Sequence, residues 1–90
     1  MGGDHLRFTF YIFEEIVMAA HEDVAHQQNL LAIYRRNLAH YLGQQAALGG
    51  SAYTPPGVMN GMREARENIR KIKNILQTWG IAVTDHPDDE

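Results

Sequence analysis

Five histidines are the side chains best suited to bind a metal ion or move a proton. They are His5, His21, His26, His40 and His86. His21 and His26 are five residues apart, which does not place them on one face of a helix. No His-Glu-x-x-His motif occurs, because His21 and Glu22 are not followed by a second histidine at the required spacing. A structural zinc site needs four converging ligands. We therefore predict solvated surface histidines and no metal site.

The hydroxyl, thiol and glycine residues also give no catalytic pattern. The hydroxyl side chains of Ser51, Thr9, Thr54, Thr78 and Thr84 lie neither in a Gly-x-Ser-x-Gly turn nor beside a plausible base. The glycine pairs at 2–3 and 49–50 are followed by no phosphate-loop lysine. The chain has no cysteine, which excludes disulfides, thiolate metal sites and a cysteine nucleophile. The sequence predicts no enzyme activity, no cofactor and no small-molecule substrate.

A basic row is the most functional-looking pattern in the sequence. Arg63, Arg66 and Arg70 follow i, i+3, i+7 spacing, with Lys71 and Lys73 beside them. Three interpretations fit: a solvated face, a contact for an acidic protein partner, or a stripe that follows phosphates. No aromatic residues alternate with the row for base stacking, and the net charge is −3. A solvated face is the simplest expectation, and a protein partner ranks above nucleic acid among the functional ones.

Two amphipathic helices must position this row. Residues 21–48 and 56–79 each carry mostly apolar residues at spacings that alternate between three and four, as in a heptad seam. The first seam is Val24, Gln27, Leu31, Tyr34, Leu38 and Tyr41, and the second is Met62, Ala65, Ile69, Ile72, Leu76 and Trp79. The loop at 49–55 is short, so the helices must be antiparallel. Tyr41 then faces Met62, Leu38 faces Ala65, and the pairing continues to Val24 and Trp79.

The predicted ends of the helices have recognisable sequence patterns. Gly49 and Gly50 should end the first helix, and Gly80 should end the second. Thr54 is placed to cap the second helix, with Pro55 at its first position. Gly43 and Gly61 fall at nearly the same level beside the loop, which indicates either chance or a close approach of the two helices.

Outside the hairpin at 21–83, the sequence allows more than one secondary structure for the N-terminal segment. In residues 1–20, Leu6, Phe8 and Phe10 alternate as in a strand, whereas Phe13, Val17 and Ala20 have helical spacing. Helix is preferred, because a lone strand would have no partner. A third alternative is that residues 1–17 are translated upstream sequence before a start at Met18. Residues 84–90 are acidic and poor in apolar side chains, which predicts a disordered tail.

Localisation follows from similar arguments. The N-terminal apolar run is interrupted by Glu14 and Glu15, unlike a signal peptide. No apolar segment reaches the roughly 20 residues that span a bilayer. The lack of cysteine fits a reducing compartment. We expect a soluble cytoplasmic protein without membrane contact.

A second apolar flank lies off the seam and needs a cover. It comprises Leu30, Ile33, Leu42, Val58, Met59 and Ile75. A lone hairpin would leave these side chains in water. The cover could be an N-terminal helix, a second copy of the chain or a neighbouring domain. We therefore predict an all-α antiparallel helical hairpin, with completion to a three-helix bundle by an N-terminal helix as one alternative.

The hairpin sequence resembles a known group of modules. The shared positions are Arg36-Asn37-Leu38 and Gln44-Gln45-Ala46 in the first helix and Pro55, Pro56, Asn60, Gly61, Arg63, Glu64, Ile69, Ile72 and Leu76 in the second. Residues 28–83 are similar to small effector-associated adaptor hairpins of bacterial signalling and conflict proteins. Such modules accompany caspase-like, TIR or STAND-type NTPase domains. The resemblance implies a non-catalytic module for recruitment or assembly.

These arguments together give a functional expectation. The chain should bind a protein partner, including a second copy of itself, through its apolar flank, with the Arg/Lys row setting orientation. The expected partner-binding residues are Leu30, Ile33, Arg63, Arg66, Arg70 and Ile75. The alternative is a small nucleic-acid-associated regulator that uses the basic row.

Overall fold

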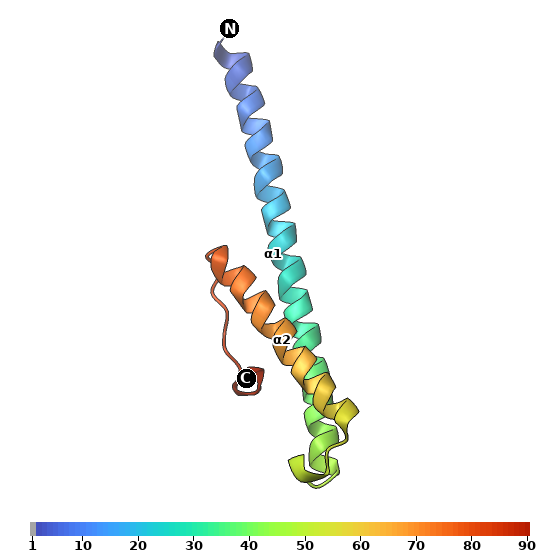
Figure 1. Ribbon diagram of the computed structural model, residues 1–90. Helices are drawn as coiled ribbons and strands as arrows, with labels where there is room; N and C mark the ends of the chain where they lie inside the picture. The colour runs from blue at the N-terminus through green and yellow to red at the C-terminus, as the bar shows by residue number, and fades with distance from the viewer. Residues whose placement is uncertain (1) are drawn as a thin grey trace.

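Two α-helices dominate the architecture of residues 2–90. The computed structural model describes the backbone of residues 2–90 and the side chains of residues 20–90. Helix α1 spans Gly2–Ala47 and helix α2 spans Pro56–Thr78, with short 3-10 helices η1 at Ser51–Tyr53 and η2 at Pro87–Asp89. Helix α2 folds back along the C-terminal half of α1, and the chain after α2 turns back again (Figure 1). The described part of the chain contains no strand, and the prediction of an all-α hairpin is confirmed.

The long helix α1 gives the molecule its rod shape. It has 46 residues, which corresponds to about 69 Å at 1.5 Å per residue. The overall extents are 73 × 17 × 15 Å. No glycine or proline interrupts the sequence between Gly3 and Gly43, so nothing breaks the helix.

This continuity corrects one prediction about residues 1–20. From Gly2 onward they extend α1 and do not turn back as a third helix, so the three-helix bundle is wrong. They also do not form a strand. The expectation that their side chains cover the apolar flank falls, for residues 1–19, outside the described side chains.

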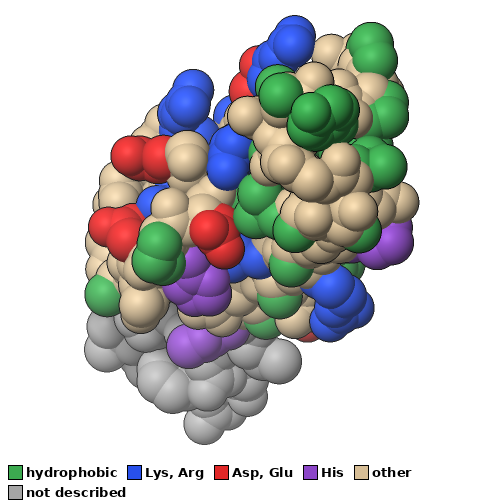
Figure 2. All heavy atoms as spheres, turned by 90° about the horizontal axis from the view of Figure 1, so that it is seen from below, with side chains coloured by type: hydrophobic (Ala, Val, Ile, Leu, Met, Phe, Trp, Pro, Cys, Tyr) green, Lys and Arg blue, Asp and Glu red, His purple; other side chains and the backbone are tan. Residues whose placement is uncertain are grey.

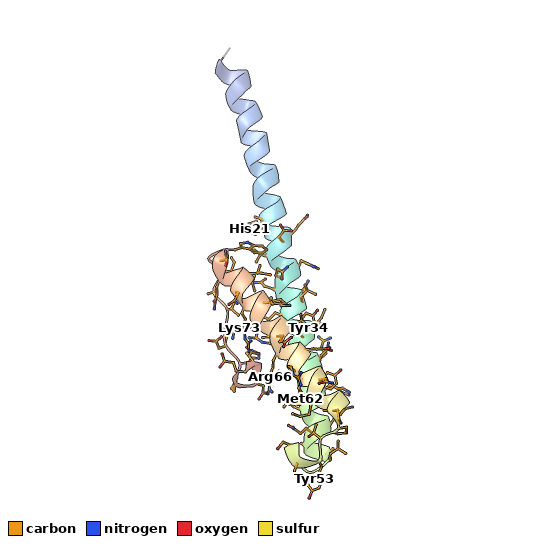
Figure 3. All side chains as sticks on the ribbon, viewed as in Figure 1. His21, Tyr34, Tyr53, Met62, Arg66 and Lys73 are labelled. Atoms are coloured by element: carbon orange, nitrogen blue, oxygen red, sulfur yellow. The ribbon has the colours of Figure 1, made fainter. Side chains whose placement is uncertain are left out.

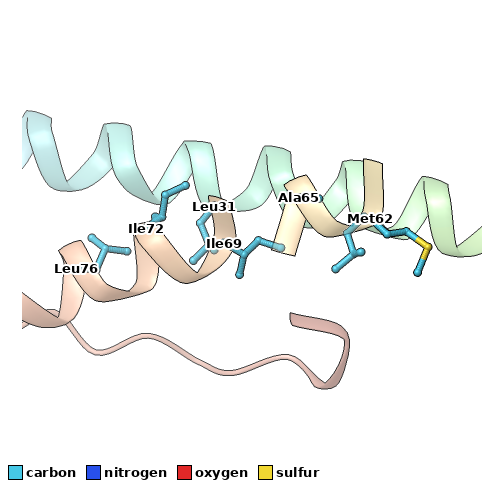
Figure 4. Close-up of a cluster of buried hydrophobic side chains, with 7 residues drawn as sticks. Leu31, Met62, Ala65, Ile69, Ile72 and Leu76 are labelled. Carbon is cyan, nitrogen blue, oxygen red and sulfur yellow. The ribbon is translucent and has the colours of Figure 1, made fainter. Parts of the chain in front are cut away.

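The core is the predicted seam between the two helices. Its buried members are Leu31 and Leu38 from α1 and Met62, Ala65, Ile69, Ile72 and Leu76 from α2. These side chains project into the space between the two helices (Figure 4). Leu38, Ile69 and Leu76 are completely buried. Burying an aliphatic side chain of this size contributes about 1.5–3 kcal/mol, so the seam is the main source of cohesion.

The seam ends sooner than predicted at the open end of the hairpin. Trp79 is 45% exposed, although its spacing matches the buried residues before it. The reason is that α2 ends at Thr78 and Trp79 is the C-cap residue. The chain then turns away at Gly80, which has a φ of 75°. Val24, the predicted partner of Trp79, is half-buried.

Glycines end both helices, as predicted. At the end of α1, Gly49 has a φ of 96°, and the N–H of Gly50 donates to the carbonyl of Gln45 at 3.0 Å. At the end of α2, the N–H of Ile81 donates to the carbonyl of Leu76 at 2.9 Å. Both patterns are Schellman motifs, in which a left-handed glycine lets the chain satisfy the last carbonyls. Ile81 also packs on the core, which turns the tail back toward the helices.

Helix α2 begins at Pro56, in agreement with the predicted range 56–79, but its cap differs from the prediction. Pro56 is the first helical residue and Pro55 is the N-cap. The Thr54 hydroxyl donates to the carbonyl of Gly50 at 2.9 Å and does not cap α2. The residue before a proline is held in extended conformation, and two consecutive prolines therefore keep both Thr54 and Pro55 out of the helix.

The predicted close approach beside the loop occurs at only one of the two glycines. A Cβ atom on Gly61 would clash with Cζ of Tyr41, so the tyrosine ring occupies the space that a side chain would need. A Cβ atom on Gly43 would meet nothing within 4 Å. Gly61 therefore has a packing reason, and Gly43 has none.

We expect opposite effects from alanine at these two positions. Gly43→Ala should raise the free energy of unfolding by up to about 1 kcal/mol, because alanine is the better helix former. Gly61→Ala should lower it by roughly 1 kcal/mol, because a clash of 1–3 kcal/mol exceeds the same helix gain. Urea unfolding followed by circular dichroism measures both. In a Tyr41→Ala background, Gly61→Ala should become stabilising. A destabilising effect that persists there would show that the ring is not the cause.

Candidate functional site

The C-terminal tail is bound to the side of the hairpin by a buried carboxylate. Asp89 is only 3% exposed. The Nε and Nη2 atoms of Arg35 donate to its Oδ1 and Oδ2 atoms at 3.1 and 2.7 Å. The same Nη2 atom donates to the carbonyl of Thr84 at 2.7 Å. Such a two-pronged contact between a guanidinium and a carboxylate is strong and geometrically specific.

Helix α2 supplies the other cationic groups of this site. Lys73 Nζ donates to Asp89 Oδ2 at 3.3 Å and also forms an ion pair with Asp85. The Nε atom of Arg66 donates to the backbone carbonyl of Asp88 at 3.1 Å. Figure 3 shows Arg66 and Lys73 on the side of α2 along which the tail runs. We call Arg35, Arg66 and Lys73 the cationic groove.

The acidic residues are themselves organised by η2. The backbone N–H of His86 donates to Asp89 Oδ2 at 3.2 Å, which forms one half of a capping box. Asp89 thus accepts from Arg35, Lys73 and the His86 backbone, and the buried charge is well satisfied. Seen from the loop end, acidic and basic side chains lie next to one another on one side of the molecule (Figure 2).

The structure therefore differs from the prediction of a disordered tail at residues 84–90. That prediction considered only the apolar surface of the tail, which is small. The ordering comes instead from ion pairs between residues 35 and 89, which are far apart in sequence. The relevant pattern was present in the sequence as an acidic terminus and a basic helix, but its geometry depends on the turn after Gly80.

Electrostatics at the site are reflected in two shifted pKa values. Burial opposes ionisation of Asp89, but hydrogen bonds from Arg35, the His86 N–H and Lys73 outweigh it and lower the pKa from 3.8 to about 2. The hydrogen bond to Asp85 is the largest cause of a raised pKa at Lys73, against some desolvation. Both shifts favour the charged forms, so the groove and tail attract each other at neutral pH.

The predicted partner-binding residues lie on two different edges of the hairpin. Ile33 precedes Arg35 by two residues, and Ile75 follows Lys73 by two residues. Two residues turn a helix by about 200°, so both isoleucines point away from the cationic groove. Ile33 is 45% exposed and Ile75 is 36% exposed, while Leu30 is half-buried against the core. We call Leu30, Ile33 and Ile75 the apolar edge.

The arginine row remains on the other edge, next to the tail. Arg63, Arg66 and Arg70 line a shallow hollow of about 240 Å³, together with Glu67 and the apolar side chains of Met59 and Met62. Arg63 donates to Asn60 at 3.2 Å, and Arg70 is exposed. The structure thus brings the three arginines together but separates them from the apolar edge. Of the remaining predicted flank, Leu42 and Val58 are half-buried and Met59 is 42% exposed.

A larger hollow lies at the open end of the hairpin. It has a volume of about 550 Å³ and is lined by Ala20, His21, Asp23, Val24, Trp79 and Ile81. His21 lies at this end of the molecule, where α1 continues past α2 (Figure 3). The hollow exists because α2 ends at Thr78, whereas α1 extends past this level toward its own N-terminus. Its lining is mostly apolar.

We expect the tail contact to make stability depend on pH in the acid range. The pKa of Asp89 is lower in the folded chain, so its stabilisation is complete above about pH 4 and is lost as the pH falls through 2. The loss should be about 1–2 kcal/mol, below the full value of the shift because Arg35 and Lys73 are partly exposed. Urea unfolding between pH 2 and 7 measures it.

Two variants separate this effect from general acid denaturation. Asp89→Asn should lower stability at pH 7 and flatten the acid limb. Asp88→Asn removes the same charge from an exposed side chain and should leave both nearly unchanged. Equal behaviour of the two variants would mean that the buried carboxylate contributes nothing specific.

The histidines and the comparisons with known proteins complete the description. His21, His26, His40 and His86 are exposed, and no three His, Asp or Glu side chains among the described residues lie close enough to hold a metal ion. In the described residues, no helix is both long and apolar enough to span a bilayer. Comparisons with protein-family models, curated proteins and solved structures find no match to this chain.

Proposed function

We propose that the chain is a non-catalytic protein–protein interaction module that self-associates or recruits a partner through its apolar edge. The observation that carries this proposal is the unequal covering of the two edges. The chain's own tail contacts Arg35, Arg66 and Lys73 on the charged edge, whereas Ile33 and Ile75 are 45% and 36% exposed on the other. Exposed aliphatic side chains next to half-buried Leu30 are typical of a contact surface.

The length of α1 supports an assembly role. Helix α2 has 23 residues, so it can cover at most half of the 46 residues of α1. Isolated helical segments are marginally stable in water, because most helical stability in proteins comes from tertiary packing. The sequence of residues 6–18 is rich in phenylalanine, isoleucine and other apolar residues. A second copy or a partner would supply the packing that α2 is too short to give.

The proposed setting is the recruitment of effector or NTPase partners. It rests on the similarity of residues 28–83 to effector-associated adaptor hairpins. In this role the arginine row would orient the partner, because charges at the border of an interface affect orientation and association rate more than affinity.

Nucleic-acid binding is the second candidate for the basic row. Arg63 and Arg70 are exposed and could contact phosphates. The carboxylates of Asp85 and Asp89, however, lie on the same edge at Lys73 and Arg35. The chain also has a net charge of −3, and no aromatic residue alternates with the basic row for base stacking, so we favour an interaction with protein.

Sedimentation velocity over a wide range of protein concentration tests the proposal. We expect the sedimentation coefficient to increase with concentration. Ile33→Glu or Ile75→Glu should weaken association at least about tenfold, because burying an unpaired carboxylate costs more than 1.4 kcal/mol.

The matched control is Met59→Glu, which places the same charge at a similarly exposed position on the other edge. It should not weaken association. A native chain that stays monomeric at every concentration would exclude self-association. An equal effect of all three substitutions would exclude the apolar edge as the contact.

A further inference from the structure

The cationic groove has the features of a ligand site, and its present occupant is the chain's own tail. Three cationic side chains from two helices converge on one short acidic segment. Arg35 holds both oxygens of Asp89, and Lys73 holds Asp85 as well as Asp89. The recognised pattern is therefore a pair of aspartates four residues apart, in a segment with a 3-10 turn at Pro87–Asp89.

The occupant is held by polar contacts, and only one of its side chains is buried. Asp89 is buried, but residues 84–88 and Glu90 are exposed. The apolar attachment of the tail ends at Ile81 and Val83, which are half-buried against the core. Exchange of the contacts to Arg35, Lys73 and Arg66 would thus free residues 84–90 and leave the seam in place.

The basic row extends beyond the part of the groove that the tail uses. Asp85 contacts Lys73 and Asp88 contacts Arg66, so this part of the tail runs toward the N-terminal end of α2. The 3-10 turn then brings Asp89 back to Lys73 and Arg35, so position 88 is the part of the tail nearest to the hollow that Arg66 lines with Arg63 and Arg70. Met59 and Met62 also line this hollow and suit an apolar side chain, because methionine adapts to varied shapes.

From these contacts we infer that the cationic groove binds an acidic peptide segment of a partner protein, and that the tail is an intramolecular stand-in which this segment replaces. The partner segment carries two carboxylates spaced like Asp85 and Asp89, with an apolar side chain at the position of Asp88 that can reach Met59 and Met62. The inference rests on the proposed function only in that the partner is a protein. It names the partner's chemistry at the charged edge and does not require self-association.

Replacement of the tail is a competition between an attached and a free ligand. A tail tethered by a few residues has an effective concentration of the order of millimolar. A free peptide with the same contacts binds weakly to the native chain, and a peptide with additional contacts binds better. Removing the tail's carboxylates therefore exposes the site without shortening the chain.

The test uses the full chain and a fluorescent synthetic peptide with the sequence of residues 83–90, measured by anisotropy. In the Asp85→Asn/Asp89→Asn chain, the peptide should bind at least about tenfold more tightly than to the native chain. The charge-matched control, Asp88→Asn/Glu90→Gln, should bind it like the native chain. The same peptide with leucine at the position of Asp88 should bind more tightly still.

Further substitutions identify the groove. In the Asp85→Asn/Asp89→Asn chain, Arg35→Lys should weaken peptide binding several-fold, because lysine keeps the charge but loses the two-pronged contact. Arg36→Lys is the matched control on the neighbouring exposed residue and should have no effect. An equal loss in both would overturn the assignment of the groove.

A second measurement covers the case in which the doubly substituted chain does not fold. In the native chain, excess unlabelled peptide should shift the amide NMR resonances of His86 and Asp89 as the tail leaves. Unchanged resonances at saturating peptide overturn the inference, as does absent binding to a substituted chain that is folded by circular dichroism. Binding of a labelled oligothymidine, without binding of the peptide, overturns it in favour of nucleic acid. Sedimentation of the same samples reports self-association separately.

Discussion

The structure depends on the apolar seam that fixes the register of α1 against α2. Leu38 and Ile69 are completely buried, so sliding one helix along the other would expose them to water. This register also decides where the charges meet. Arg35 follows the buried Leu31 by four residues, and Lys73 follows the buried Ile72 directly. Both cations are therefore carried to one edge of the hairpin, where a single carboxylate can contact them. The cationic groove is a consequence of hydrophobic packing.

The two edges of the hairpin are stabilised by different forces. The charged edge is stabilised by directional contacts, because the hydrogen bonds from Arg35 and Lys73 fix the position of the Asp89 carboxylate. The apolar edge has no such directional contacts, and Ile33 and Ile75 expose only apolar surface to solvent. Directional contacts discriminate between ligands, whereas apolar area supplies affinity with little discrimination. A module with both edges can separate selection of a partner from the strength of its binding.

Sequence reasoning predicted the hairpin well because its determinants are local. The three- and four-residue spacing of Leu31, Leu38 and Ile69 and the glycines after each helix act within one or two turns. The failures concern long-range geometry. The docking of Asp89 on Arg35 depends on the turn at Gly80. Thr54 does not cap α2, because Pro56 keeps Pro55 extended, so that Pro55 is the N-cap residue instead. The sequence pattern predicts one binding surface for Ile75 and the arginine row, although the helical rotation between them places them on opposite edges.

A small chain gains a particular advantage from a tail held by charges. Among the side chains of residues 20–90, seven buried apolar residues make a limited core, so each additional contact is a notable share of a stability that is marginal in domains of this size. Asp89 adds such a contact without adding apolar surface. If an acidic segment of a partner takes its place, the bonds to Arg35 and Lys73 are exchanged for equivalent ones, and the groove remains neutralised. The exchange is then nearly balanced in free energy. Selection of the partner depends on what its segment adds beyond the tail, at Arg63, Arg70 and the two methionines.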